Sequence, residues 1–317
     1  MAHNQITSEQ YIGFRKQKEF VGKRKVDIGR IIAFVLLLVF CIVWVSPFVI
    51  MFFGSVRGYK DTLMYPQELL YPHSGYTLEN YEMLLFGKIP EDMGQVNNTQ
   101  DYEVGRWIIN SCISAVGGTL LYLLVASFAA YAFTFIDFKY RNLLFAIIVA
   151  SMVIPGAATT VGNHSLVYGM GLHRSLLALI IPGLGGVYGM YLIKTFFESI
   201  PKDLIESAKM DGYNNFKIFY KIVLPLGKTV LFVQGLFGFM GGWNDLIWPR
   251  MLYGPTDGKL WTLQVGMDNV ITNYVKNGDA IGTALAGGFI CVLPVLVVYI
   301  IAQEKIIEGM SSSGIKG

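Results

Sequence analysis

Residues 198–228 read ESIPKDLIESAKMDGYNNFKIFYKIVLPLGK and form a polar interruption between two hydrophobic runs. Pro201 suits a first helical turn, because its missing N–H would be unpaired there in any case. Gly212 can end that helix in a left-handed conformation. An asparagine pair that begins at Asn214 can cap a second short helix, which should stop near Pro225. The stretch therefore predicts two short helices joined by a turn.

The first of these helices carries a pattern of small and apolar side chains. Leu204 and Ala208 fall on one face at i and i+4, with Ile205 beside them. Ser207 and Ala208 are small, so the surface of another protein can approach the helix closely. The alternative interpretation is an amphipathic helix that rests on a membrane surface.

The composition of the whole chain indicates an integral membrane protein. Of the 317 residues, 53% are hydrophobic and 15% are charged, whereas a soluble domain averages about a quarter charged residues. The net charge of +3 says little by itself. Cysteines inside apolar runs are typical of buried core residues rather than of disulfides or metal sites. The three cysteines all lie in such runs, at Cys41, Cys112 and Cys291.

The apolar residues cluster into runs close to the roughly 20 residues that an α-helix needs to cross a bilayer. These runs predict an all-α, polytopic membrane protein with six transmembrane helices. Pro294 is expected to kink the last of them. The predicted spans cover about 31–53, 107–135, 142–161, 175–197, 229–252 and 281–302. They define a basic N-terminal segment, a transmembrane domain and a tail, at 1–30, 31–303 and 304–317.

The distribution of charge predicts which ends of the spans face the cytoplasm. Basic residues are concentrated in the segment before the first span and in the stretch 194–228. In the long loop 54–105, in contrast, most of the charged residues are acidic. Because basic loops stay inside, we expect both termini and 198–228 in the cytoplasm of a bacterial cell and 54–105 outside. That loop should contain a short helix near Leu78, and it is either a plain connector or a docking surface.

The polar interruption resembles the EAA loop of ATP-binding-cassette importer permeases. The family pattern is Glu-Ala-Ala, three residues, Gly, nine residues and Ile-x-Leu-Pro, and the spacing fits here throughout. Ser207 is the one departure, at a position where the family usually has Ala. The resemblance implies a type I importer permease fold in which this loop forms a coupling helix that docks on an ATPase subunit. The coupling residues that it implies are Glu206, Ser207, Ala208, Asp211, Gly212, Leu224 and Pro225.

Further motifs resemble the sugar-importer permeases of the maltose-system type. They are Met152-Val153-Ile154-Pro155, Trp243-Asn244-Asp245, Trp261-Thr262-Leu263 and the ending 309–317. The resemblance implies a permease subunit of an ATP-driven carbohydrate importer, for an oligosaccharide or a polysaccharide fragment. It also implies tail contacts with the ATPase by Gly314, Lys316 and Gly317, although Ser312 and Ser313 replace the usual Ala and Gly there.

The resemblance implies several partners and leaves the nucleotide chemistry outside this chain. The expected partners are a homologous second permease, two ATPase subunits that hold ATP and Mg, an extracytoplasmic solute-binding protein, the carbohydrate and membrane lipid, but no nucleic acid. Gly227-Lys228-Thr229 imitates the end of a phosphate-binding loop, but Ile222 stands where that loop needs a glycine. The histidines have no metal-ligand spacing. We therefore expect neither an enzyme nor a metal site.

Polar and aromatic residues in two spans are candidates for the solute pathway. Polar groups within a span usually face protein or a water-filled cavity, which selects Tyr122 and Tyr131. Sugar sites combine aromatic faces with hydrogen-bonding amides, which selects Trp243 and Asn244. Asp245 is an acidic residue within a predicted span and is therefore a candidate for direct sugar contact. It lies close enough to the outer interface that it can instead be hydrated. Trp243 fits an interfacial aromatic belt equally well.

Three other functions remain open at this point. A permease for a non-sugar solute would carry the same coupling loop. An ion-coupled secondary transporter would need midplane acids or broken helices in inverted halves, and the sequence offers neither clearly. A membrane enzyme or receptor would need a catalytic constellation that the sequence does not display.

Overall fold

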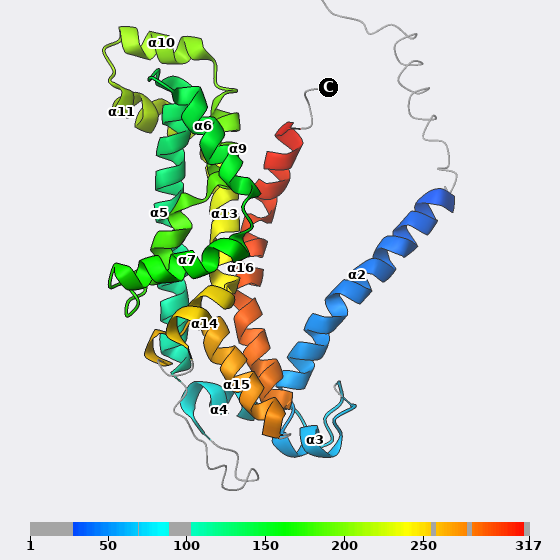
Figure 1. Cartoon of the computed structure of the whole chain (residues 1–317). Coiled ribbons are helices and arrows are strands. Elements are labelled where there is room, and N and C mark those ends of the chain that lie inside the picture. Colours follow the sequence, from blue (N-terminus) through cyan, green and yellow to red (C-terminus); the bar gives the residue numbers. More distant parts are fainter. Residues whose placement is uncertain (1–27, 69, 89–102, 255–257, 278–280, 314–317) are drawn as a thin grey trace, which may run out of the picture. The chain divides into compact units, whose positions relative to one another are not determined.

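The computed structural model describes residues 28–68, 70–88, 103–254, 258–277 and 281–313 (Figure 1). The predicted basic segment up to residue 27 lies outside these ranges, as do the predicted tail contacts Gly314, Lys316 and Gly317. Regular structure within the described ranges is helical, apart from one isolated bridge between Arg57 and Tyr76. The predicted all-α class is therefore confirmed.

Three helices are long and apolar enough to cross a membrane alone: α2 (Ile28–Ser55), α5 (Val104–Phe135) and α16, whose span is Ile281–Glu304. Three bent helix pairs raise the number of candidate spans within the described ranges to as many as six, if each pair counts as one span. The pairs are Arg141–Val153 with Gly156–Gly169, bent by 105°; Leu177–Gly185 with Val187–Phe197, bent by 49°; and Asn215–Leu226 with Lys228–Asn244, bent by 78°.

Two of the bends divide predicted spans, and a third predicted span ends earlier than expected. The predicted span 142–161 is divided into α6 (Arg141–Ala150) and α7 (Gly156–Gly169). Ile154 is extended before Pro155, as the proline ring requires of the preceding residue.

The predicted span 175–197 is divided at a glycine, and the predicted span 229–252 is shorter than expected. Gly186 separates η3 (Ile181–Gly185), which follows α8 (Leu177–Ile180), from α9 (Val187–Phe197). The predicted span 229–252 ends early, because α13 (Lys228–Asn244) stops before a separate helix α14 (Ile247–Tyr253). In contrast, Pro294 lies within α16 (Ile281–Ser313), which is one continuous helix.

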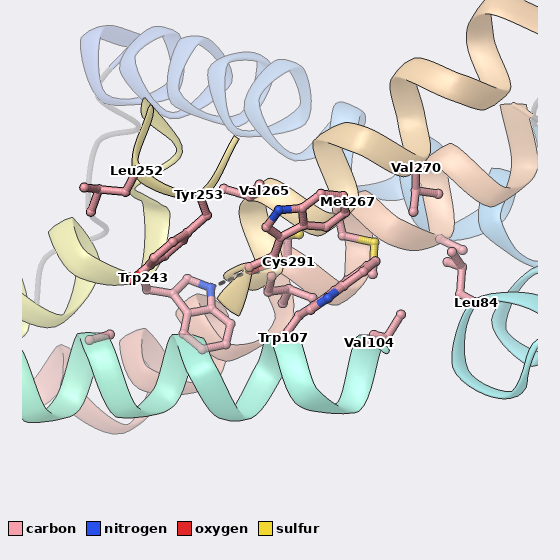
Figure 2. Packing of buried hydrophobic residues seen from close by; sticks show 14 of the residues in the cluster. Leu84, Val104, Trp107, Trp243, Leu252, Tyr253, Val265, Met267, Val270 and Cys291 are labelled. Atoms are coloured by element: carbon pink, nitrogen blue, oxygen red, sulfur yellow. Dashed lines mark hydrogen bonds between the residues drawn. The ribbon is translucent and has the colours of Figure 1, made fainter. Parts of the chain in front are cut away.

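A first hydrophobic core joins α5, α13, α15 (Leu263–Asn277) and α16 around buried tryptophans (Figure 2). Trp243 donates its indole N–H to the carbonyl of Cys291 at 3.0 Å, which ties α13 to α16. Trp107 donates to the carbonyl of Gly258 at 3.0 Å, and Asn110 donates to the carbonyl of Trp261 at 2.9 Å. Since these donors lie among apolar groups, each bond removes a costly unsatisfied polar group.

A second hydrophobic core lies under the short helices α10 (Lys202–Met210) and α11 (Asn215–Ile218). It joins them to α5 and α9. Figure 1 shows α10 and α11 together at one end of α5. The fully buried members of this second core are Ala130, Ile193, Phe197, Ile218 and Val223.

The segment 56–88 after α2 contains short helices. They include α3 (Tyr59–Met64) and α4 (Glu79–Phe86), and α4 confirms the predicted helix near Leu78. Asn80 is buried and donates to the carbonyls of Ser55 and Arg57 at 2.9 and 2.7 Å, while Thr283 of α16 donates to its amide oxygen at 3.0 Å. Burial raises the pKa of Tyr81, which shares a 2.7 Å hydrogen bond with Ser55.

The close approach of α15 to α5 provides a stability test. A Cβ on Gly266 would enter the ring of Trp107, whereas a Cβ on Gly162 of α7 would meet nothing within 4 Å. Gly266→Ala should therefore destabilise the protein by about 1–3 kcal/mol through overpacking. Gly162→Ala should leave stability unchanged or raise it slightly, because alanine favours helix. Thermal midpoints of the purified variants in detergent measure both; equal midpoints would contradict the packing.

Candidate functional site

Helix α10 begins and ends close to the positions that the sequence predicts. Pro201 is the residue before the helix, with ψ of 129°, and not part of the first turn. At the other end Gly212 has φ of +78°. The N–H of Tyr213 donates to the carbonyl of Ala208, and that of Gly212 to Lys209, each at 3.0 Å. This pair of bonds is a Schellman motif, which favours glycine at its left-handed position.

The buried face of α10 is centred on Ile205 and Ala208. Ile205 and Ala208 are 3% and 5% exposed and pack into the second core. Leu204, which the i, i+4 spacing places on one face with Ala208, is 47% exposed, and Met210 is 83% exposed. The second core lies under the i, i+3 pair Ile205 and Ala208, so Leu204 is turned away from it. The predicted coupling residues Glu206, Ser207 and Asp211 are exposed.

Helix α11 is capped as predicted, and the helical run that it begins ends at Leu226, one residue after Pro225, as predicted. The side chain of Asn214 accepts a 2.8 Å hydrogen bond from the N–H of Lys217. The chain continues as a π-helical turn, Phe219–Val223, and as α12 (Leu224–Leu226), which contains Pro225. The direction changes only at Gly227, before α13. Pro225 is tolerated because it lies in the first turn of α12, where its missing N–H costs little.

Two of the predicted pathway residues, Tyr122 and Asp245, line one hollow of about 280 Å³ between α5, α8, η3 and α13. The Tyr122 hydroxyl donates to Oε1 of Gln234 at 3.3 Å. Asp245 follows the last residue of α13, and its carboxylate accepts from the N–H of Trp248 at 3.3 Å. Sequence reasoning missed Gln234, whose only signal is a single amide within an apolar run.

The other three predicted pathway residues lie elsewhere. Tyr131 is buried in the second core, with its ring 5.2 Å from that of Phe219. Trp243 is buried in the first core, so its ring is neither open to a solute nor part of an interfacial belt in this conformation. Asn244 is exposed and donates to the carbonyl of Met240 on its own helix at 3.0 Å.

The chain is similar in sequence to several curated transport permeases. It is 30% identical over 243 residues to the galactooligosaccharides transport system permease protein GanQ of Bacillus subtilis, covering 76% of this chain and 81% of that protein. It is 27% identical over 212 residues to the arabinooligosaccharides transport system permease protein AraQ of Bacillus subtilis, covering 67% and 74%.

A solved structure supports the fold. A chain of a bacterial ABC transporter involved in the import of the acidic polysaccharide alginate superposes with a TM-score of 0.73 at 22% identity, covering 89% of this chain and 98% of that chain. The predicted importer-permease fold is therefore confirmed. The family model for binding-protein-dependent transport system inner membrane components matches residues 122–306. Since this match spans more than half of the chain, the protein belongs to that family.

Proposed function

We propose that this protein is a membrane permease subunit of an ATP-driven carbohydrate importer and that α10 couples it to separate ATPase subunits. One observation carries the proposal. In a member of the inner-membrane component family, the short helix α10 packs one face against the second core and leaves its other residues exposed. The names of GanQ and AraQ support an oligosaccharide as the solute.

The exposed surface of the α10–α11 loop suits a protein partner. Leu204 and Met210 of α10 are exposed, and so are Phe216 and Tyr220 in the following turns. Exposed apolar groups gathered on one surface mark protein-interaction or membrane-interaction sites. Glu206 and Ser207 lie exposed on the same helix. We infer that this surface enters a groove on the ATPase subunit on the cytoplasmic side.

The second core gives α10 a mechanical connection to the spans. Ile205 and Ala208 share that core with Ala126 and Ala130 of α5 and with Phe197 of α9. Packed interiors are dense and transmit displacement rather than absorb it. In this proposal, closure of the ATPase pair on ATP moves α10, and the core carries the movement to α5 and α9. Hydrolysis then reverses the change.

The hollow at Tyr122 is the proposed part of the solute pathway in this chain. A phenol, an amide and a carboxylate lie in or beside it, in Tyr122, Gln234 and Asp245. Such groups pair with sugar hydroxyls, while the ring of Tyr122 offers an apolar face. Asn244 is proposed to act at the exposed end of the same pathway.

The family description names a transport system that depends on a binding protein, so this chain would work together with other subunits. We propose a homologous second permease, two ATPase subunits that hold ATP and Mg, and an extracytoplasmic binding protein. Both termini and α10 would face the cytoplasm, with the segment from α3 to α4 outside. Gly314, Lys316 and Gly317 would reach the ATPase pair.

Reconstitution tests this assignment against its alternatives. The chain is assembled with its permease partner, ATPases and binding protein in nanodiscs, and ATP hydrolysis is measured with a panel of oligosaccharides. Stimulation by a saccharide that requires the binding protein supports the proposal. Stimulation only by a non-sugar solute would point to the alternative importer. Transport by the isolated chain, driven by an ion gradient, would establish a secondary transporter instead.

A valine at Gly212 should uncouple transport. A β-branched residue in the left-handed region costs about 1–2 kcal/mol, and the turn that fixes the end of α10 would shift. We expect Gly212→Val to lose most saccharide-stimulated ATP hydrolysis while the chain still inserts into the membrane. Sugar uptake and ATP hydrolysis in the assembled importer measure the effect.

Gly87 supplies a matched control for this variant. It ends α4 with φ of +66°, and a Cβ there, as at Gly212, would meet nothing within 4 Å. Gly87→Val therefore carries the same backbone strain far from α10 in the chain. If both variants lost coupling equally, general instability would explain the loss, and the specific role of α10 would be wrong.

The packing of Gly189 beside Tyr122 yields a second test. A Cβ on Gly189 would run into the Tyr122 hydroxyl and lie 2.7 Å from Oε1 of Gln234. Gly189→Ala should therefore displace the phenol, lower the thermal midpoint and reduce uptake, with an overpacking cost of about 1–3 kcal/mol. Adding Tyr122→Leu, which removes the clashing phenol and leaves only the end of the Gln234 side chain to shift, should restore much of the stability but not the uptake.

Gly241 provides the control within the same hollow. A Cβ there would meet nothing within 4 Å, so Gly241→Ala should leave the thermal midpoint nearly unchanged. Additive losses from Gly189→Ala and Tyr122→Leu, without recovery in the double variant, would refute the contact. Thermal midpoints in detergent and uptake in vesicles measure these effects.

A further inference from the structure

A separate hollow of about 320 Å³ lies where α5 ends, α6 begins, α9 ends and α10 begins. Its lining combines charged and aromatic side chains. The proposed function does not use it. The lining residues that matter here are Phe133, Arg141, Phe145, Lys194, Glu198 and Lys202.

The hollow has an excess of positive charge. Arg141 donates to the carboxylate of Asp137 at 2.8 Å, but Asp137 does not line the hollow and is 97% exposed. Lys194 donates to Glu198 at 2.5 Å. Lys202, at the start of α10, forms no ion pair with any residue in the described ranges. Three cations therefore meet two carboxylates, and the positive charge of Lys202 is left for an anion.

Aromatic rings form the apolar part of the hollow. The ammonium of Lys194 lies 4.4 Å from the ring centroid of Phe145, and the rings of Phe133 and Phe145 are 5.4 Å apart. A cation over an aromatic face is held in place while it keeps donor capacity for a second partner. The site thus presents ammonium and guanidinium groups beside apolar surface.

Helix α6 continues the apolar surface away from the hollow. Leu143, Leu144 and Ile147 are exposed on the first turns of α6, directly after Arg141. In a membrane component, exposed apolar side chains at the start of a span contact acyl chains. A ligand that is anionic at one end and apolar at the other would satisfy both parts.

We propose that this hollow binds the phosphate headgroup of an anionic membrane phospholipid, with its acyl chains along α6. Basic pockets between membrane helices hold such headgroups, and each nearby Lys or Arg contributes about 1 kcal/mol. An acidic side chain of a partner protein is less well matched, because it would leave the exposed face of α6 without an apolar partner. The lipid would tether the first turn of α10 through Lys202.

Native mass spectrometry of the full chain tests the site directly. The protein in mild detergent is titrated with phosphatidylglycerol and, separately, with phosphatidylcholine. Wild type should retain one phosphatidylglycerol more tightly than phosphatidylcholine. Lys202→Gln should weaken phosphatidylglycerol binding about fivefold, which corresponds to about 1 kcal/mol. Lys194→Gln should weaken it similarly. Lys209→Gln, an equal charge change on α10 outside the lining, should match wild type.

Two further experiments test whether the anion in the hollow is instead free phosphate or a carboxylate of a partner protein. Millimolar inorganic phosphate should compete weakly; if it displaced phosphatidylglycerol completely, the site would belong to free phosphate and the lipid proposal would be wrong. Purified ATPase subunits are added to the same variants. If Lys202→Gln weakened their binding but left phosphatidylglycerol retention unchanged, the hollow would belong to a protein carboxylate, which also overturns the proposal.

Discussion

The burial of two side chains of α10, Ile205 and Ala208, is the interaction on which the proposed coupling depends. A nine-residue helix is too short to be stable alone in water, so this helix exists because the second core holds it. The same core contains Phe197 of α9 and Val223 of the π-helical turn that follows α11. Because one face is fixed in this way, the opposite face is left exposed for a partner, and movement of the partner is passed to the spans.

Local backbone rules allowed much of the coupling site to be predicted from sequence. Gly212 ends α10 and Asn214 caps α11 because both effects depend only on the immediate neighbours. The spacing placed Leu204 and Ala208 on one face of α10, but only Ala208 is buried, because periodicity gives a stripe and the surrounding helices decide its exact direction. The membrane class followed from composition and the lengths of the apolar runs, which tertiary packing does not alter.

The remaining errors came from packing between distant parts of the chain. Trp243 and Tyr131 have the residue types expected of a sugar pathway, but each is enclosed in a core by helices that are remote in sequence. Span breaks at Pro155 and Gly186 were also missed, because apolar runs continue across them. Gln234 gains significance only from its hydrogen bond to Tyr122. Such pairings need three-dimensional information.

Site-directed cross-linking at Ser207 is the most direct test of the account. A single cysteine is placed there after the three natural cysteines are replaced by alanine, and the chain is assembled with an ATPase subunit that carries a cysteine in its docking groove. The account predicts a disulfide cross-link to the ATPase and no labelling by an impermeant maleimide from outside intact cells. Labelling from outside, without any cross-link, would contradict it.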